Sequence, residues 1–170
     1  MKNTIRITLI LGLLILTFRP SAAMGQFFFQ ENEGVGKPVQ DFNLKIVGGE
    51  KVSLSSFLNG SRAIIFFWAT WCPHCRRELN DLNKNREVMA QKGIKIVLVD
   101  VGEKETVVQQ YVQKNNIHMP IFLDTDSSVA ESYGLVGVPT FYFVDEKGVV
   151  RDVQHSLPED YEAILSASQG

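Results

Sequence analysis

The two cysteines of the chain, Cys72 and Cys75, lie in the stretch FFWATWCPHCRRE at residues 66–78. A Cys-x-x-Cys pair can be a redox couple, two ligands of a metal ion or a permanent disulfide. A permanent disulfide is the weakest interpretation, because so short a loop removes little chain entropy and stabilises a fold only slightly. The spacing therefore predicts a redox pair, with metal binding as the alternative.

The place of Cys72 predicts that it is the exposed, attacking thiol. A helix is expected from residue 73, and the free N–H groups and partial positive charge at its start favour a thiolate. Pro73 costs that helix nothing at its first position, and His74 can add a positive charge beside the sulfur. Cys75, one turn further on an apolar stripe, is expected to be the shielded thiol that resolves a mixed disulfide.

Glu78 follows Cys75 by three residues, so the two side chains are neighbours on a helix. At the edge of the buried stripe the carboxylate would be partly desolvated, and it could accept the proton of the Cys75 thiol. The alternative is a solvated glutamate that pairs with Arg77 or Lys84.

A second motif, GVPT at residues 137–140, stands just before a predicted strand. One interpretation is a cis-proline loop beside the cysteines, in which the backbone of Val138 pairs with an extended substrate. The other is an ordinary proline at the start of an edge strand. The tetrapeptide alone is weak evidence, but it gains weight when a Trp-Cys-x-x-Cys motif precedes it in a β-α-β frame.

The elements that must position these motifs alternate between strands and helices. Hairpins with glycine turns are expected at both ends of the series, and the apolar runs at 63–68 and 94–101 predict strands buried on both faces. This order predicts one α/β domain with a mixed sheet and helices on both faces. We expect strands at 42–46, 51–54, 63–68, 94–101, 121–123, 140–144 and 149–153, and helices at 73–91, 105–115, 127–133 and 158–165.

The first 23 residues have the pattern of a secretory signal peptide. Lys2 and Arg6 precede an apolar run at residues 7–18, and small residues stand near Ala23. The run is shorter than the roughly 20 residues of a membrane-spanning helix, although an uncleaved membrane anchor is the alternative. We expect a signal peptide at 1–23, a flexible lead-in at 24–37 and one folded domain at 38–170.

Charge limits the kinds of partner. Without residues 1–23 the chain has 14 basic and 19 acidic residues, a net charge of −5. A domain of that charge, with no basic stripe, is not expected to bind nucleic acid. Export would also place the cysteines in an oxidising compartment, where a Cys-x-x-Cys pair can cycle.

From about Gly36 to its C-terminus the chain resembles the exported TlpA/ResA-like thiol-disulfide oxidoreductases of thioredoxin fold. The segments that carry the resemblance are GKPVQDFNL (36–44), FFWATWCPHCRRE (66–78), VDVGE (99–103) and FLDTDSSVAESYGLVGVPTFYFVDEKG (122–148). The resemblance implies a thioredoxin-like fold with an N-terminal β-hairpin and an extra helix inserted before the third core strand. It implies Cys72 as attacking thiol, Cys75 as resolving thiol, Glu78 as active-site carboxylate and no cofactor. The substrate-binding residues would be Trp71, Val138 and the cis-proline Pro139.

The same resemblance predicts a monomeric periplasmic or otherwise extracytoplasmic reductant of exported protein thiols, such as those of apocytochrome c, served by a membrane-bound electron donor. The Pro73-His74 dipeptide resembles that of oxidising DsbA proteins instead, so an oxidant or isomerase is the second prediction. A copper or zinc carrier that adds His118 or His155 to the cysteines is a weaker third. A peroxidase is weaker still, because Ala69 stands where peroxiredoxins have threonine.

Overall fold

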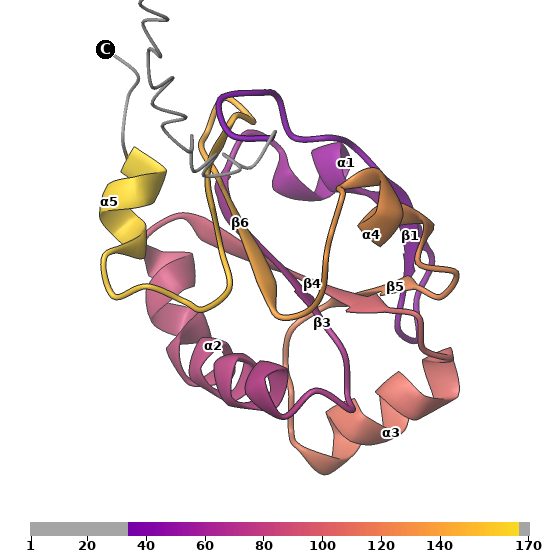
Figure 1. Ribbon diagram of the computed structural model, residues 1–170. Helices are drawn as coiled ribbons and strands as arrows, with labels where there is room; N and C mark the ends of the chain where they lie inside the picture. The colour runs from indigo at the N-terminus through magenta and orange to yellow at the C-terminus, as the bar shows by residue number, and fades with distance from the viewer. Residues whose placement is uncertain (1–33, 167–170) are drawn as a thin grey trace, which may run out of the picture.

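The computed structural model describes residues 34–166, which form one α/β domain (Figure 1). The predicted signal peptide and most of the predicted lead-in lie outside the described residues. The strands are β1 (Asn43–Ile46), β2 (Lys51–Ser53), β3 (Arg62–Trp68), β4 (Ile94–Val101), β5 (Ile121–Asp124), β6 (Thr140–Val144) and β7 (Val150–Gln154). The helices are α1 (Leu54–Leu58), α2 (Pro73–Gln91), α3 (Glu105–Lys114), α4 (Ser128–Ser132) and α5 (Tyr161–Ser166).

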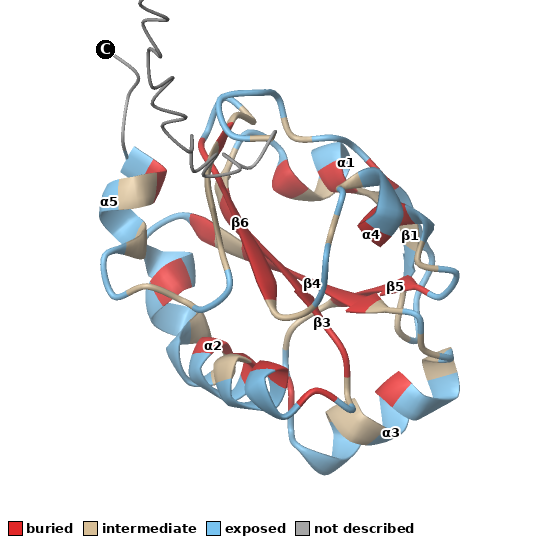
Figure 2. Cartoon of the chain, viewed as in Figure 1, coloured by how far each residue is buried: buried red, intermediate tan, exposed pale blue. Residues whose placement is uncertain are grey.

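The seven strands form a single mixed sheet in the order β2-β1-β5-β4-β3-β6-β7. The central strands β3, β4 and β5 are parallel, whereas β6 runs antiparallel to β3, and β1 runs antiparallel to β5. Strands β3 and β4 are apolar along most of their length because helices cover both faces of the sheet, and Figure 2 shows them as buried.

Alternate residues of β3 belong to two separate cores. Ile64, Phe66 and Trp68 face α2, α3 and α5, while Ile65 and Phe67 face α1 and α4. Phe66 is fully buried, and its ring stacks on the ring of Phe141 with 4.3 Å between the centroids. The period of two along a strand thus assigns each apolar side chain of β3 to one core.

The residues before β1 attach to the hairpin between β6 and β7. The amide of Gly36 donates to Val150, the amide of Val150 donates to Lys37, and the amide of Val39 donates to Gly148. These hydrogen bonds, of 2.7 to 3.0 Å, hold the start of the described chain at the end of β6 that lies opposite Pro139.

The fold class predicted from the sequence is confirmed, with two corrections to its elements. Leu54 was predicted to end a strand, but it begins α1, a helix that the sequence analysis missed. Its N-cap Ser53 accepts a hydrogen bond from the amide of Ser56, and its C-cap Asn59 has a left-handed conformation. The last helix begins at Tyr161 and not at Pro158, because a turn precedes it. Within residues 34–166 no helix is both long and apolar enough to cross a bilayer.

Candidate functional site

The cysteine pair lies where β3 ends and α2 begins. Cys72 and Cys75 form a disulfide, with 5.3 Å between their Cα atoms. The buried strand β3 fixes one side of the pair, and the 19-residue helix α2 fixes the other. The site therefore lies at the carboxyl end of a central parallel strand, where functional groups gather in open α/β sheets.

Cys72 is the N-cap residue of α2. Its sulfur accepts a hydrogen bond from the amide of Cys75, at 3.1 Å, and Pro73 occupies the first turn, where its missing N–H is not needed. Negative charge on this sulfur would thus meet an N–H donor and the positive end of the helix. The sequence pattern predicts an exposed Cys72, but both cysteines are buried: Cys72 is 4% exposed and Cys75 is 0% exposed. Cys72 is still the more accessible of the two.

The loop before β6 meets the cysteines from the other side. The peptide bond between Val138 and Pro139 is cis, which agrees with the first of the two interpretations of this motif. The carbonyl oxygen of Val138 lies 3.8 Å from the sulfur of Cys72. Because β6 pairs with β3, the sheet brings together two motifs that are far apart in the sequence.

A hollow of about 250 Å³ lies beside this contact. Trp71 and Val138, which the sequence analysis assigned to substrate binding, both line it. Its apolar rim is open, since Trp71 is 67% exposed and Val136 is 98% exposed. Glu131 and Ser127 supply polar atoms to the same hollow. Two large exposed apolar side chains next to a reactive pair are suited to contact another protein.

His74 and Glu78 are four residues apart, so they lie about one turn apart along the same face of α2, but they differ in exposure. Glu78 is half-buried, and its carboxylate accepts a hydrogen bond of 3.1 Å from the amide of Leu157, a residue between β7 and α5. It pairs with neither Arg77 nor Lys84, the partners that the alternative interpretation named. His74 is exposed on the first turn of the helix.

Two acidic residues near the site were not singled out in the sequence. Glu103 accepts hydrogen bonds from the amide of Thr70, at 2.5 Å, and from its hydroxyl, at 2.7 Å. Asp100 is fully buried at the end of β4. Burial raises the pKa of Asp100 to about 8, and the carboxyl of Glu103 beside it adds to the rise. The one available signal was an aspartate in a run that is apolar except for Lys95 near its start.

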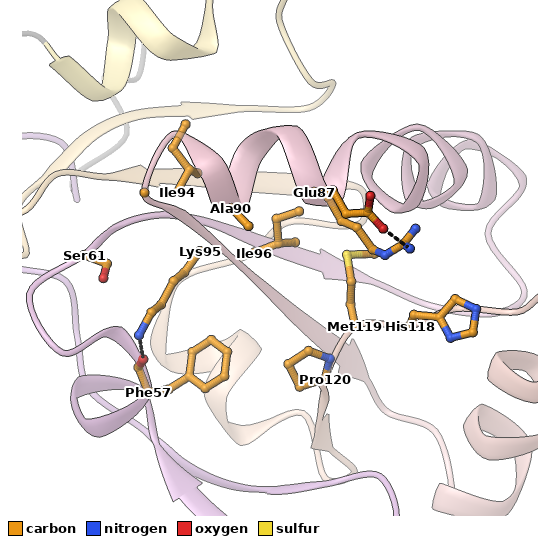
Figure 3. Close-up of a pocket in the computed structure, with 12 residues that line it drawn as sticks. Phe57, Ser61, Glu87, Ala90, Ile94, Lys95, Ile96, His118, Met119 and Pro120 are labelled. Carbon is orange, nitrogen blue, oxygen red and sulfur yellow. Dashed lines mark hydrogen bonds and ion pairs between the residues drawn. The ribbon is translucent and has the colours of Figure 1, made fainter.

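The two histidines considered as metal ligands lie apart from each other. His155 is close to the cis-proline, with its Nδ1 atom 3.0 Å from the carbonyl oxygen of Pro139. His118 lines a groove of about 550 Å³ beside the last turns of α2, which also contains Met119 and Lys95 (Figure 3). That groove is about four helical turns from the N-terminus of α2. The part of the chain that the structure describes holds no group of three His, Cys, Asp or Glu residues placed to bind a metal ion.

Comparison with known proteins agrees with this geometry. The model of the AhpC/TSA family matches residues 35–153, which is more than half of the chain. The thiol-disulfide oxidoreductase ResA of Geobacillus kaustophilus is 30% identical over 128 residues, which cover 74% of this chain and 73% of that protein. ResA of Bacillus subtilis is 29% identical over 134 residues, which cover 78% and 74% of the two chains.

Among solved structures, a thiol:disulfide interchange protein of the thioredoxin family from Chlorobium tepidum superposes with a TM-score of 0.65 at 29% identity. The match covers 75% of this chain and 92% of that one. A thioredoxin-like fold, a disulfide at the start of α2 and these relatives lead to one assignment. The chain belongs to the AhpC/TSA family and is a protein-disulfide oxidoreductase of the ResA-like kind.

Proposed function

We propose that the chain reduces disulfides of exported proteins outside the cytosol. In the proposed reaction the thiolate of Cys72 attacks one sulfur of a substrate disulfide, and the other substrate sulfur leaves as a thiolate. Cys75 then attacks the sulfur of Cys72, which releases the second substrate thiol and leaves the Cys72–Cys75 disulfide. Two electrons pass to the substrate, and a membrane-bound thiol donor restores the dithiol.

The observation that carries this proposal is the N-cap position of the Cys72 sulfur. This sulfur accepts an N–H of α2, whereas Cys75 lies inside the first turn with no exposed surface. A helix terminus stabilises the thiolate, which is the nucleophile in disulfide exchange. The asymmetry supports Cys72 as the attacking thiol and Cys75 as the resolving one.

The surroundings of the pair support a protein substrate. An extended segment could pair with the backbone of Val138 next to Pro139 and place an apolar side chain in the hollow lined by Trp71. Haem-attachment thiols of apocytochrome c are the substrate class that the resemblance to ResA suggests. We also assign the role of proton acceptor for Cys75 to the half-buried Glu78.

The location and boundaries belong to the same proposal. Residues 1–23 would direct export, and residues 38–170 would form the domain that works as a monomer in the periplasm or an equivalent compartment. Residues 24–37 would be the lead-in between them, of which Gly36 and Lys37 are hydrogen-bonded to Val150 of the β6–β7 hairpin. An uncleaved anchor would instead tether the same domain to the membrane.

Replacement of Cys75 tests the proposed reaction. A Cys75→Ala variant should accumulate mixed disulfides with exported proteins, because no thiol remains to release them. These adducts should be enriched in proteins with Cys-x-x-Cys-His segments, and a Cys72→Ala control should capture none. Adducts formed only by the control would contradict the assignment of the two thiols.

The reduction potential separates the proposed reductant from the alternative oxidant, which the exposed His74 between the cysteines favours. A potential near about −270 mV, as in thioredoxin, would support a reductant. A potential near about −120 mV, as in DsbA, would support an oxidant. Equilibration of the full-length chain with glutathione redox buffers provides the measurement.

A further inference from the structure

A buried carboxyl group lies close to the redox site and has no role in the reaction described above. Asp100 has no exposed surface, and neither of its carboxyl oxygens accepts a hydrogen bond from an N–H or O–H donor among the described residues. In the register of β3 and β4 it lies directly beside Trp68, whose indole N–H is also buried without a partner in that part of the chain. Unpaired buried polar groups are costly, so this pair calls for an explanation.

The groups around Asp100 favour its neutral form. Burial has the largest effect, followed by the carboxyl of Glu103 on the loop after β4 and by Asp124 at the end of β5, and together they raise the pKa of Asp100 to about 8. From α3, Tyr111 packs on the ring of Trp68 with 5.6 Å between the centroids, and the guanidinium of Arg76 on α2 acts on that tyrosine. None of these neighbours compensates a negative charge on Asp100 directly.

Glu103 connects this buried group to the reactive loop. Its two carboxyl oxygens accept the amide and the hydroxyl of Thr70, two residues before Cys72. Cys72 in turn donates its amide to the carbonyl oxygen of Ala69, at 3.2 Å. The position of Glu103 therefore sets the position of the short loop from which the reactive sulfur projects.

We propose that Asp100 is a positioning residue: its protonated carboxyl keeps Glu103 in place, and Glu103 fixes the loop that carries Cys72. A proton on Asp100 can be shared with the carboxylate of Glu103. Loss of that proton would place the buried carboxylate of Asp100 beside the carboxylate of the half-buried Glu103, and their repulsion would move Glu103 away from Thr70. The loop would then lose both hydrogen bonds that fix it.

The functional part of this inference rests on the proposed attack by Cys72, whereas its structural part does not. A loosened loop would misplace the sulfur relative to Val138 and slow the attack on a protein disulfide. The chain is thus expected to lose reducing activity above about pH 8 through Asp100, separately from any titration of the cysteines.

Two measurements on the full-length reduced chain test the inference between pH 6 and pH 10. The first is amide hydrogen exchange of Thr70, and the second is the single-turnover rate of oxidation by insulin. In the wild type, protection of Thr70 should fall at least tenfold through a transition near pH 8. In Asp100→Asn, where an amide can donate to Glu103 at every pH, the transition should be absent. At pH 9 this variant should react at least threefold faster than the wild type, and at pH 7 the two should agree within twofold.

Three further variants serve as controls. The side chain of Asp100→Leu cannot donate to Glu103. At pH 7 its Thr70 amide should therefore be as weakly protected as the Thr70 amide of the wild type is at pH 9. In Glu103→Gln, the Thr70 amide should be weakly protected from hydrogen exchange at every pH, with no transition near pH 8. Asp124→Asn removes a negative neighbour of Asp100, so it should keep the transition but move it to lower pH.

If the fall in Thr70 protection near pH 8 persists unchanged in Asp100→Asn, the inference is overturned. This comparison does not depend on whether Asp100→Leu folds. Equal Thr70 protection in the wild type at pH 7 and pH 9 would also overturn it. If protection of the Thr70 amide falls near pH 8 as predicted but the Cys75→Ala variant forms no mixed disulfides, the proposed function is rejected and the role of Asp100 in holding the loop stands.

Discussion

At the scale of single residues, Cys72 is both the proposed nucleophile and the cap of the helix that follows it. The sulfur takes the place that a serine or aspartate oxygen usually fills at an N-cap. Formation and reduction of the disulfide therefore change the capping of α2 together with the redox state. Side chains on the first turn of the helix can act on the reduction potential through the same sulfur.

His74→Ala tests the influence of that first turn. A positive imidazole stabilises the thiolate of the reduced form, so its removal should make the protein more reducing. Because His74 is exposed and solvent screens its charge, we expect a shift of only about 10–30 mV. Equal potentials for the two proteins at pH 6 would show that His74 does not act on Cys72.

The place of the disulfide and of the cis-proline could be predicted from sequence because each depends on a short local motif. Cys72, Cys75 and Pro139 lie in short motifs whose geometry a helix start or a proline determines. Asp100 and Glu103 could not be found in this way. The bond between Thr70 and Glu103 spans 33 residues and exists only because β3 and β4 pair in one particular register.

At the scale of elements, length decides how well the sequence predicts the structure. Helix α2 was predicted over its observed range, since 19 residues give several repeats of the apolar stripe and a glycine follows them. Helix α1 has five residues and buries only Leu54 and Leu58, which is too short a pattern to separate from the end of a strand. The pairing of β1 with β5 was also not predicted, because no local signal specifies strand neighbours.

Phe66→Ala tests the contribution of β3 to stability. The ring is fully buried and stacks on Phe141, so its loss should leave a cavity and lower the free energy of unfolding by about 3–5 kcal/mol. Denaturation in urea at pH 7 gives the value. Trp71→Ala is a matched control from the exposed end of the same segment, and it should cost less than about 1 kcal/mol. A larger loss for the control than for Phe66→Ala would contradict this account of the core.

At the scale of the whole molecule, Asp100 should make stability fall as the pH rises. Its pKa is raised in the folded state to about 8 from an ordinary value of 3.8, so between these values the folded chain holds a proton that the unfolded chain releases. The folded state is then disfavoured by up to about 1.4 kcal/mol for each pH unit. Above about pH 8 the loss is complete.

Asp100→Asn should remove that slope. Relative to the wild type, the variant should gain stability steadily between pH 5 and pH 8, whatever its stability at pH 5. Urea denaturation at four pH values in this interval measures the difference. A constant difference over the whole interval would mean that Asp100 titrates alike in the folded and unfolded chains.

The attachment of residues 36–39 to the β6–β7 hairpin determines how the molecule would stand on a surface. Strand β6 runs from Pro139, beside the cysteines, to the hairpin where the described chain begins, a span of about 17 Å for five residues. If residues 1–23 stay in a bilayer, the described chain begins at the hairpin end of β6, and Pro139 and the cysteines lie toward the other end of that strand. A membrane-bound donor would then have to bring its own thiols to the end of the domain away from the attachment point.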